Sequence, residues 1–233
     1  MKIRMTAKQP DETEFIGCVI DKYHFTEDDR VMMEEVYQEI LRSVTPYAIY
    51  KINRWITGLS YIDDEQAALV VMTLGKGPDI LQDTYTSEGK LQEAYMVDCI
   101  SNEILLNMYR EFNQLYARFH RRYVTRYVFI GEDISLTCAG DLLDKLYEQD
   151  VEEKDVTANE YGVLIPSKSV IFYALLSENP TTLCQGICMG CSNKGCPNKI
   201  DDKAKKQGFY QIGKSDSKVT LNYGYIKIFG KDS

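Results

Sequence analysis

Apolar residues recur at helical spacing in two long segments of the chain. The first segment, residues 26–44, begins with a T-x-x-D pattern at Thr26 and Asp29 that is typical of a helix N-terminus. Its apolar positions are Met32, Val36, Ile40 and Val44. Because the residue before a proline avoids the α conformation, Thr45-Pro46 predicts the end of this helix.

The second segment, about residues 90–120, predicts a long amphipathic helix. Its apolar positions mostly follow i, i+3, i+4 spacing and are Leu91, Ala94, Tyr95, Ile100, Ile104, Leu105, Met108, Phe112, Leu115 and Phe119. Cys99 lies near this stripe, and we expect a small buried thiol there. We expect the same of Cys18 and Cys138. A shorter helix is predicted at residues 140–149.

Segments rich in aromatic and β-branched residues predict the strands. They are residues 47–55, 59–62, 67–74, 123–130, 163–165, 170–176, 208–212 and 219–229. The run ALVVM, residues 68–72, is almost wholly apolar, which favours a strand buried on both faces. Gly75-Lys76-Gly77-Pro78 is interpreted as a break after it. Because helices and strands mix without strict βαβ alternation, the pattern predicts an α+β fold.

Composition and charge narrow the classes of function. The 233 residues are 44% hydrophobic and 27% charged, as is ordinary for a globular protein. The formal net charge of -8 argues against nucleic-acid binding, because clustered lysines and arginines are needed to neutralise phosphates. The basic run at residues 118–126 is a local exception. It fits the C-terminal end of a helix, or a contact with an anion or a partner.

We expect a cytoplasmic protein without a membrane span. The N-terminal stretch MKIRMTAKQPDETE lacks the apolar region of a signal peptide, and no window holds about 18 consecutive apolar residues. We divide the chain into an α+β domain at residues 1–180 and a Cys-rich metal-binding segment with C-terminal strands at residues 181–233. Because cytosolic thiols stay reduced, clustered cysteines indicate metal or redox chemistry rather than disulfides.

Four cysteines cluster in the stretch C-Q-G-I-C-M-G-C-S-N-K-G-C, and they are Cys184, Cys188, Cys191 and Cys196. The intervening glycines allow the tight turns that four converging sulfurs need. Thiolates suit zinc and iron–sulfur clusters, so we predict a metal site, with unligated redox thiols as the alternative. A radical-AdoMet barrel is not expected, because too little chain follows Cys184. The sequence does not decide between zinc and a 4Fe–4S cluster, although the compact spacing and the absence of histidine favour the iron–sulfur cluster.

Three stretches of the chain, taken in order, resemble the conserved segments of one protein family. The stretch V-V-M-T-L-G-K-G-P-D-I-L, followed by A-Y-M-V-D-C-I-S, resembles the family's T-L-G strand and turn and its Asp-bearing helix, with Asp98 at the Asp. The helix then runs into the basic segment and Arg126. The stretch V-T-A-N-E-Y-G-V-L-I-P-S-K-S-V is similar to the family's L-T-x-S-x-x-M-x-P-x-x-S-V run. The family is that of the cobalamin-dependent methionine synthase activation domains, and the chain resembles its short stand-alone, corrinoid-associated members that carry a cysteine cluster.

The resemblance implies a mixed, mainly antiparallel twisted sheet flanked by long helices. It also implies an activation domain or accessory subunit that helps to reactivate a cobalamin-dependent methyltransferase such as methionine synthase. In that family, S-adenosylmethionine (AdoMet) methylates the reduced cobalt irreversibly and so draws the uphill reduction forward, while the partner protein supplies the cobalamin. The AdoMet-contact candidates are Arg126, Asp98 and Gly131. A structural Arg126 and a capping Asp98 are the alternatives.

The chain departs from the family at the AdoMet motif. Where family members read R-P-A-x-G-Y-P or S-P-G-Y-G-D, this chain reads R-Y-V-F-I-G-E-D-I-S-L. A glycine there lets the backbone approach a ligand closely, and Ile130 would crowd it. A second hypothesis is therefore a metal-bearing binding module with a decayed AdoMet site that docks on a corrinoid protein. A zinc-knuckle adaptor for nucleic acid is a third hypothesis, which the acidic charge opposes.

Overall fold

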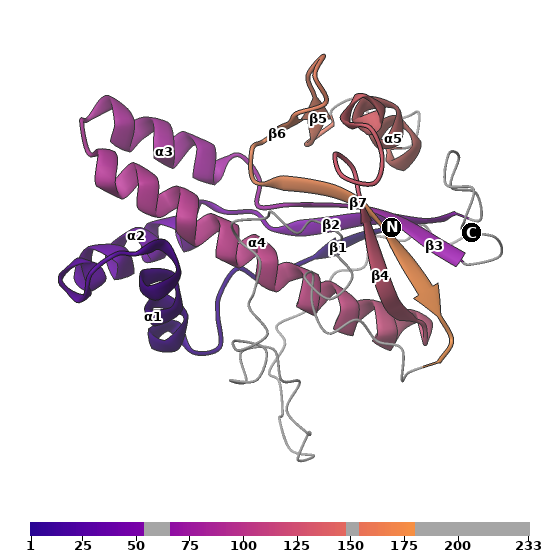
Figure 1. The fold of residues 1–233 in the computed structure, drawn as a ribbon, viewed down its shortest axis with the longest axis horizontal. Helices are drawn as coiled ribbons and strands as arrows, with labels where there is room; N and C mark the ends of the chain where they lie inside the picture. Colours follow the sequence, from indigo (N-terminus) through magenta and orange to yellow (C-terminus); the bar gives the residue numbers. More distant parts are fainter. Residues whose placement is uncertain (54–65, 148–153, 180–233) are drawn as a thin grey trace.

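The protein is described by a computed structural model that covers residues 1–53, 66–147 and 154–179. Within these residues, a five-stranded antiparallel sheet has the order β1-β2-β3-β7-β4 (Figure 1). Its strands are β1 (Lys2–Arg4), β2 (Tyr47–Asn53), β3 (Gln66–Thr73), β4 (Tyr123–Phe129) and β7 (Ser169–Ser177). A separate hairpin consists of β5 (Thr157–Ala158) and β6 (Leu164–Ile165). The predicted α+β class with a mainly antiparallel sheet is confirmed.

Helices cover both faces of the sheet. One face packs against α1 (Glu12–Tyr23), α2 (Arg30–Ser43), α3 (Gly77–Ser87) and the long α4 (Leu91–His120). The other face packs against α5 (Ala139–Leu146), with the β5–β6 hairpin beside it (Figure 1). Two short 3-10 turns, η1 (Glu27–Asp29) and η2 (Leu136–Cys138), lead into α2 and α5.

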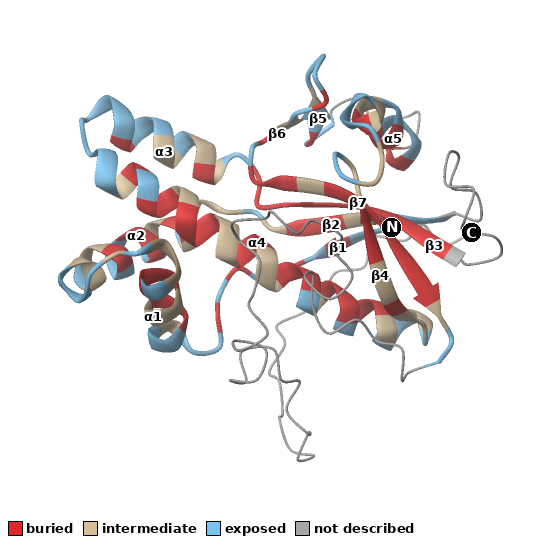
Figure 2. Cartoon of the chain, in the orientation of Figure 1, coloured by how far each residue is buried: buried red, intermediate tan, exposed pale blue. Residues whose placement is uncertain are grey.

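The central strands β3 and β7 are buried on both faces, as the ALVVM run predicts. They pair from Thr73 opposite Ser169 to Gln66 opposite Leu176. Each residue from Ala68 to Met72 is at most 1% exposed. Figure 2 shows most of both strands as buried, with an intermediate stretch near the start of β7. These two strands are therefore the scaffold on which both layers of helices rest.

Alternating residues of β3 divide the interior into two cores. Val70 and Met72 point into the first core, between the sheet and helices α1–α4. Leu69 and Val71 point into the second core, between the sheet and α5. Residues two positions apart on a regular strand therefore face the same core. The core to which one residue belongs shows which side of the sheet the other faces.

Helix α4 and its basic end agree with the sequence prediction. The helix ends at His120, and Arg121 adopts a left-handed conformation with its N–H bonded to the carbonyl of Ala117. Cations are favoured at this end of the helix dipole. His120 Nε2 lies 2.6 Å from the Tyr50 hydroxyl, and burial, followed by the charge of Arg122, lowers the pKa of the imidazole.

The predicted start and end of α2 are also confirmed. Thr26 N and Asp29 Oδ2 lie 2.8 Å apart in a capping box directly before the helix. The helix ends at Ser43, two residues before Thr45. The helix predicted at 140–149 and the strand predicted at 163–165 are present with slightly different bounds, at Ala139–Leu146 and Leu164–Ile165.

Several elements were not predicted, and α3 shows why. The predicted break after the ALVVM strand is confirmed, because β3 ends at Thr73, but the pattern does not predict the helix that begins at Gly77. Proline is favoured in the first turn of a helix, where its missing N–H has no partner to lose. Helix α1 and the short strands β1 and β5 were also missed. The predicted strands at 59–62, 208–212 and 219–229, like the predicted segment at 181–233, lie outside the described residues.

Candidate functional site

The side chain of Lys168 joins two of the stretches that carry the family resemblance. Its Nζ donates to Asp98 Oδ1 at 2.5 Å and to Asn102 Oδ1 at 3.0 Å. Asp98 and Asn102 lie one turn apart on α4, while Lys168 directly precedes β7. The Lys168 side chain is 8% exposed and that of Asp98 is 37% exposed. The ammonium is therefore the more deeply buried partner of this ion pair.

The T-L-G-K-G-P-D stretch reaches the same place from the end of β3. Ser169 Oγ donates to Thr73 Oγ1 at 2.8 Å, and Leu74 N donates to the Lys168 carbonyl at 3.0 Å. In the first turn of α3, Asp79 accepts hydrogen bonds from both the backbone N–H and the hydroxyl of Ser167. We call this polar group the Lys168 cluster, and its members are Thr73, Asp79, Asp98, Asn102, Ser167, Lys168 and Ser169.

The glycines of T-L-G-K-G-P-D have a packing role. Gly75 has a φ of +79°, and a Cβ added to it would lie 2.3 Å from Thr45 Oγ1. A Cβ on Gly77 would lie 2.2 Å from the Ser43 carbonyl oxygen. Both positions press the turn against the end of α2, so the two glycines are accounted for without a ligand.

A second polar group lies further along α4. Glu103 Oε1 accepts hydrogen bonds from Lys22 Nζ at 2.6 Å and from the Tyr23 hydroxyl at 2.9 Å, both on or next to α1. Burial, with smaller contributions from nearby carboxylates, raises the pKa of Cys18 and of Cys99 to about 11. Both thiols are therefore protonated at neutral pH and weakly nucleophilic.

The predicted burial of the three isolated cysteines is correct for one of them. Cys99 is fully buried in the first core, whereas Cys18 and Cys138 are partly exposed. Cys18 lies on an α1 face that packs only partly, and Cys138 lies in the short η2 turn at the edge of the second core. The prediction of buried thiols was wrong for these two residues because it rested on residue type alone.

Arg126 lies on β4 opposite Leu175, whose side chain belongs to the second core. Its guanidinium is 3.8 Å from Asp133 Oδ1, and its side chain is 40% exposed. Its Nε is buried and has no hydrogen-bond partner among the described residues. Arg126 is thus a half-exposed cation. Its ion pair with Asp133 is long and therefore weak, and its Nε donor has no partner among the described residues.

Gly131 lies in the turn that follows β4. It has a φ of +104°, in the region that favours glycine, and its N–H donates to the Ile134 carbonyl at 2.6 Å. Asp133 Oδ2 fixes the same turn by accepting the N–H of Phe129 at 2.9 Å. Because Asp133 also faces Arg126, the structure brings Arg126 and Gly131 together at one end of β4.

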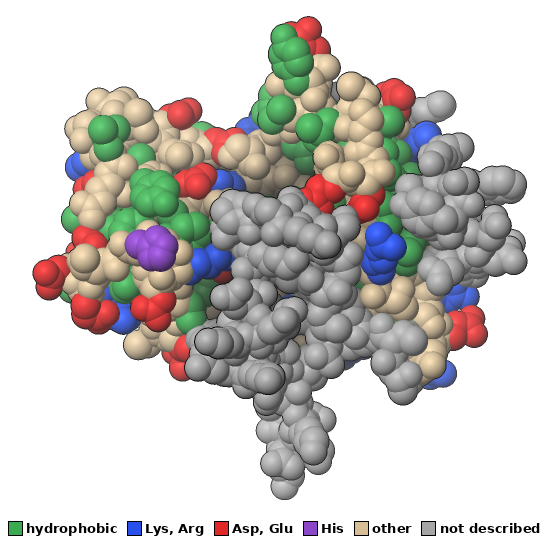
Figure 3. Space-filling model, in the orientation of Figure 1, with side chains coloured by type: hydrophobic (Ala, Val, Ile, Leu, Met, Phe, Trp, Pro, Cys, Tyr) green, Lys and Arg blue, Asp and Glu red, His purple; other side chains and the backbone are tan. Residues whose placement is uncertain are grey.

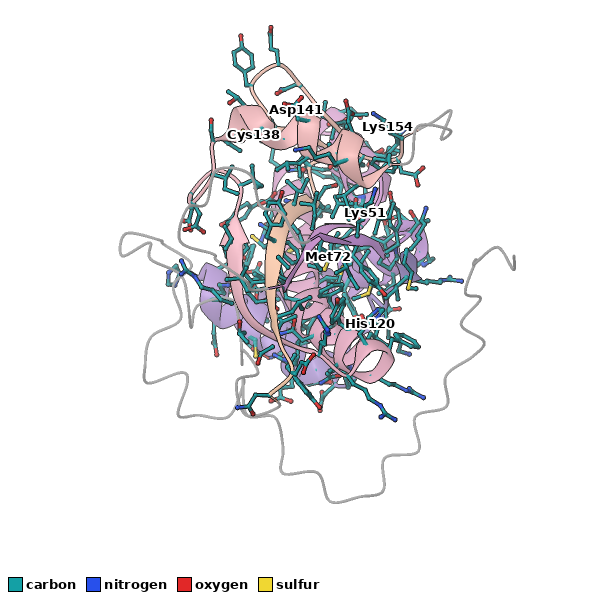
Figure 4. The ribbon with its side chains drawn as sticks, turned by 90° about the vertical axis from the view of Figure 1, so that its right-hand side faces the viewer. Lys51, Met72, His120, Cys138, Asp141 and Lys154 are labelled. Atoms are coloured by element: carbon teal, nitrogen blue, oxygen red, sulfur yellow. The ribbon has the colours of Figure 1, made fainter. Side chains whose placement is uncertain are left out.

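Asp98 lies on the other side of the sheet from this pair. Tyr127, the neighbour of Arg126 on β4, points into the first core and donates to Asn113 of α4, so Arg126 points away from α4. Figure 4 shows the two layers, with His120 at the end of α4 on one side of the sheet and Asp141 of α5 on the other. The structure therefore does not bring Asp98 together with Arg126 and Gly131.

The four cysteines predicted to bind a metal, Cys184, Cys188, Cys191 and Cys196, lie outside the described residues. In residues 1–53, 66–147 and 154–179, no group of three or more His, Cys, Asp or Glu side chains is arranged to hold a metal ion. The metal site stays a prediction that rests on the spacing and on the soft thiolate donors.

Sequence reasoning did not single out Lys168, Asn102 or Glu111. Burial raises the pKa of Glu111 to about 7, although its carboxylate accepts the backbone N–H of Thr6 at 3.0 and 3.2 Å. The I-P-S-K-S-V stretch contains Lys168, but only the paired strands show that it faces α4. For Glu111, an acid four residues from Leu115 on an otherwise apolar stripe was the available signal.

A scan against models of protein families gave no match, and a search of curated proteins found no similar protein. Among the described residues, no helix combines the length and the apolar character that crossing a membrane requires.

Proposed function

We propose that the chain is an accessory protein of the activation-domain type. It assists the reductive reactivation of a cobalamin or corrinoid methyltransferase such as methionine synthase, through AdoMet-dependent remethylation. The observation that supports this proposal best is the Lys168 cluster. Stretches around Thr73, Asp98 and Lys168, which resemble the family in sequence order, contact one another directly in space.

In this proposal the Lys168 cluster has a positioning role. The ion pair between Lys168 and Asp98 holds the start of β7 against α4, and the bonds from Ser167 to Asp79 hold α3 to the same segment. Charge-assisted hydrogen bonds of this kind fix orientation as well as adding stability. The sheet and helices are thereby held in one arrangement when a partner docks.

The end of β4 carries the AdoMet-contact candidates. The buried Nε of Arg126, which has no hydrogen-bond partner among the described residues, would donate to a carboxylate, and the exposed, left-handed Gly131 lies in the turn beside it. When bound, AdoMet supplies the methyl group. The residues of this chain would hold its carboxylate, and Asp133 would exchange its weak ion pair with Arg126 for solvent contact.

The four-cysteine segment would hold either a 4Fe–4S cluster or zinc. An iron–sulfur cluster suits the delivery of an electron to the partner's cobalt, whereas zinc suits a structural clamp. The donor set of four thiolates accepts both. The corrinoid partner brings its own cobalamin, so the described residues need to supply only contacts and orientation.

One observation favours the alternative, a metal-bearing binding module with a decayed AdoMet site. Asp98 is already neutralised by Lys168 and lies across the sheet from Arg126, so these two candidates do not form one pocket. In this alternative the chain docks on a corrinoid protein and keeps the metal, but it does not bind AdoMet.

A reactivation assay tests the proposal. A corrinoid methyltransferase in the cobalt(II) state is mixed with reductant, AdoMet and the metal-loaded chain, and methylcobalamin is followed by its visible absorbance. We expect faster formation with the wild type than with Arg126→Ala, while Arg118→Ala on the exposed end of α4 serves as the matched control. Calorimetric titration separates the two functions, since saturable AdoMet binding that Arg126→Ala removes excludes the alternative. The absence of acceleration with every corrinoid protein tested contradicts the proposed reactivation function, whereas the alternative, which needs no AdoMet, predicts that result.

A further inference from the structure

The outward face of the β5–β6 hairpin is apolar. Val163 and Ile165 flank Leu164 and share the face opposite to it, with Val163 54% and Ile165 51% exposed. Leu164 points inward and packs against the second core. Tyr161, at the tip of the same hairpin, is 70% exposed. A short hairpin normally turns polar residues to solvent, so an outward apolar row indicates a contact surface.

The tip of the hairpin is held in one conformation by its own hydrogen bonds. Asn159 Oδ1 accepts the backbone N–H groups of Tyr161 and Val163, both at 3.0 Å. The backbone adds bonds from Asn159 N to the Val163 carbonyl and from Gly162 N to the Asn159 carbonyl, both at 2.9 Å. A surface that is already ordered loses little entropy when it binds.

Gly162 seats the hairpin on η2. It has a φ of +81°, and a Cβ added to it would lie 2.1 Å from the carbonyl oxygen of Leu136. Leu136 is itself 46% exposed and lies beside the tip. Leu136, Tyr161, Val163 and Ile165 therefore form one surface, which we call the hairpin surface.

The surroundings of the hairpin surface are acidic. The segments 126–145 and 154–168, which contain it, hold six acidic residues against four cations, Arg126, Lys145, Lys154 and Lys168. Their acidic residues are Glu132, Asp133, Asp141, Asp144, Asp155 and Glu160. Of these, Asp133, Asp144 and Asp155 form ion pairs with Arg126, Lys154 and Lys2. Figure 3 shows hydrophobic side chains on the hairpin with acidic side chains next to them.

We infer that the hairpin surface docks a protein partner that presents an apolar spot ringed by lysines and arginines. Complementary charge steers such a partner and suppresses wrong ones. A second copy of this chain would place like charges opposite one another, and an anionic lipid surface would be repelled for the same reason. This inference does not depend on the proposed function, since it uses neither a corrinoid nor AdoMet.

The test uses the full chain and a fluorescent helical peptide with leucines on one face and lysines on the other. Two peptides serve as references, one with the same composition in shuffled order and one with glutamates in place of the lysines. We expect the amphipathic cationic peptide to bind, and the combined variant Tyr161→Ser, Val163→Thr, Ile165→Thr to weaken binding at least about tenfold. Ile80→Ser with Leu91→Ser, which removes two other exposed apolar side chains, is expected to leave the affinity unchanged.

A second variant keeps the apolar side chains but moves them. Gly162→Ala cannot keep its place against the Leu136 carbonyl, so it is expected to weaken peptide binding although no contact side chain changes. Thermal unfolding of each variant checks that the fold is kept. Equal weakening by the hairpin and control variants would overturn the inference.

Other occupants give different results. A dimer in sedimentation that dissociates in the combined hairpin variant would show a second copy on this surface and overturn the inference. Carbodiimide cross-links within one chain, from Glu160 or Asp141 to lysines of residues 180–233, would show that the chain covers its own surface and would overturn it as well. Peptide binding that is lost only in the hairpin variants, with a monomer throughout, supports it.

Discussion

The unequal burial of Lys168 and Asp98 predicts that their substitutions have unequal costs. Removing Asp98 leaves an ammonium that is only 8% exposed with one remaining acceptor, Asn102. Leaving a buried charge without its counter-ion costs about 3–5 kcal/mol. Removing Lys168 leaves a carboxylate that is 37% exposed and regains water, so the cost is close to that of lost charge-assisted hydrogen bonds, about 1.5–3 kcal/mol.

We therefore expect Asp98→Ala to destabilise the protein more than Lys168→Met. The double variant, which leaves no unpaired charge, is expected to be more stable than Asp98→Ala alone. Urea unfolding followed by circular dichroism gives the free energy of unfolding of each variant. The exposed pair of Lys2 and Asp155, with side chains 52% and 54% exposed, is the control, and Lys2→Met is expected to cost less than about 1 kcal/mol.

The opposite order of stability would refute this reasoning. If Lys168→Met is the more damaging change, the methylenes of the lysine and their packing outweigh its charge. If the double variant is no more stable than Asp98→Ala, the cost arises from α4 itself and not from an unpaired ammonium. Each result is visible in the denaturation midpoint at unchanged slope.

Three further predictions follow from other parts of the chain. Burial raises the pKa of Glu111 to about 7, so the native state binds this proton more tightly than the unfolded state. The wild type is therefore expected to lose stability relative to Glu111→Gln as pH rises from about 4.3 to 7. Urea midpoints across this range measure the difference, and parallel curves for the two proteins would contradict the prediction. Gly77→Ala is expected to destabilise the protein by more than about 2 kcal/mol, because the added methyl group would collide with the Ser43 carbonyl. Gly140→Ala, with open space around the added Cβ, is a near-neutral control. Equal melting temperatures for the two variants would contradict this prediction. Cys188→Ser is expected to lose bound metal after anaerobic purification while Cys18→Ser retains it; elemental analysis and the visible spectrum identify iron or zinc, and an unchanged metal content in Cys188→Ser would refute the predicted site.

The hydrophobic pattern predicted much of the fold. The run from Ala68 to Met72 predicted a strand buried on both faces, and the stripe along residues 90–120 predicted α4 almost to its last residue. Both signals are strong because many side chains report the same period. The start of α3 was missed because Gly77 and Pro78 have opposite meanings at the end of a strand and in the first turn of a helix.

The candidate site was less accessible from sequence. Asp98 and Lys168 are 70 residues apart, and only the pairing of β3 with β7 sets the start of β7 beside α4. The sequence predicts that Arg126 lies on a strand. The face of the sheet from which its side chain projects depends on a register shift between Val124 and Arg126, which no local sequence pattern predicts. Residue type and order therefore predicted the elements, while the partners of each charge required the three-dimensional arrangement.

The pairing of β3 with β7 has a consequence for folding. The hydrogen-bonded partners in this pair are far apart in the chain, since Thr73 faces Ser169 and Gln66 faces Leu176. Closing so long a loop is slow, because its entropic cost comes before the contacts that offset it. While the chain is being synthesised, the apolar edge of β3 has no partner until β7 has left the ribosome, and such an edge invites aggregation. We expect chains truncated before Ser169 to be insoluble, and we expect chaperones that bind extended apolar segments to select the β3 sequence during synthesis.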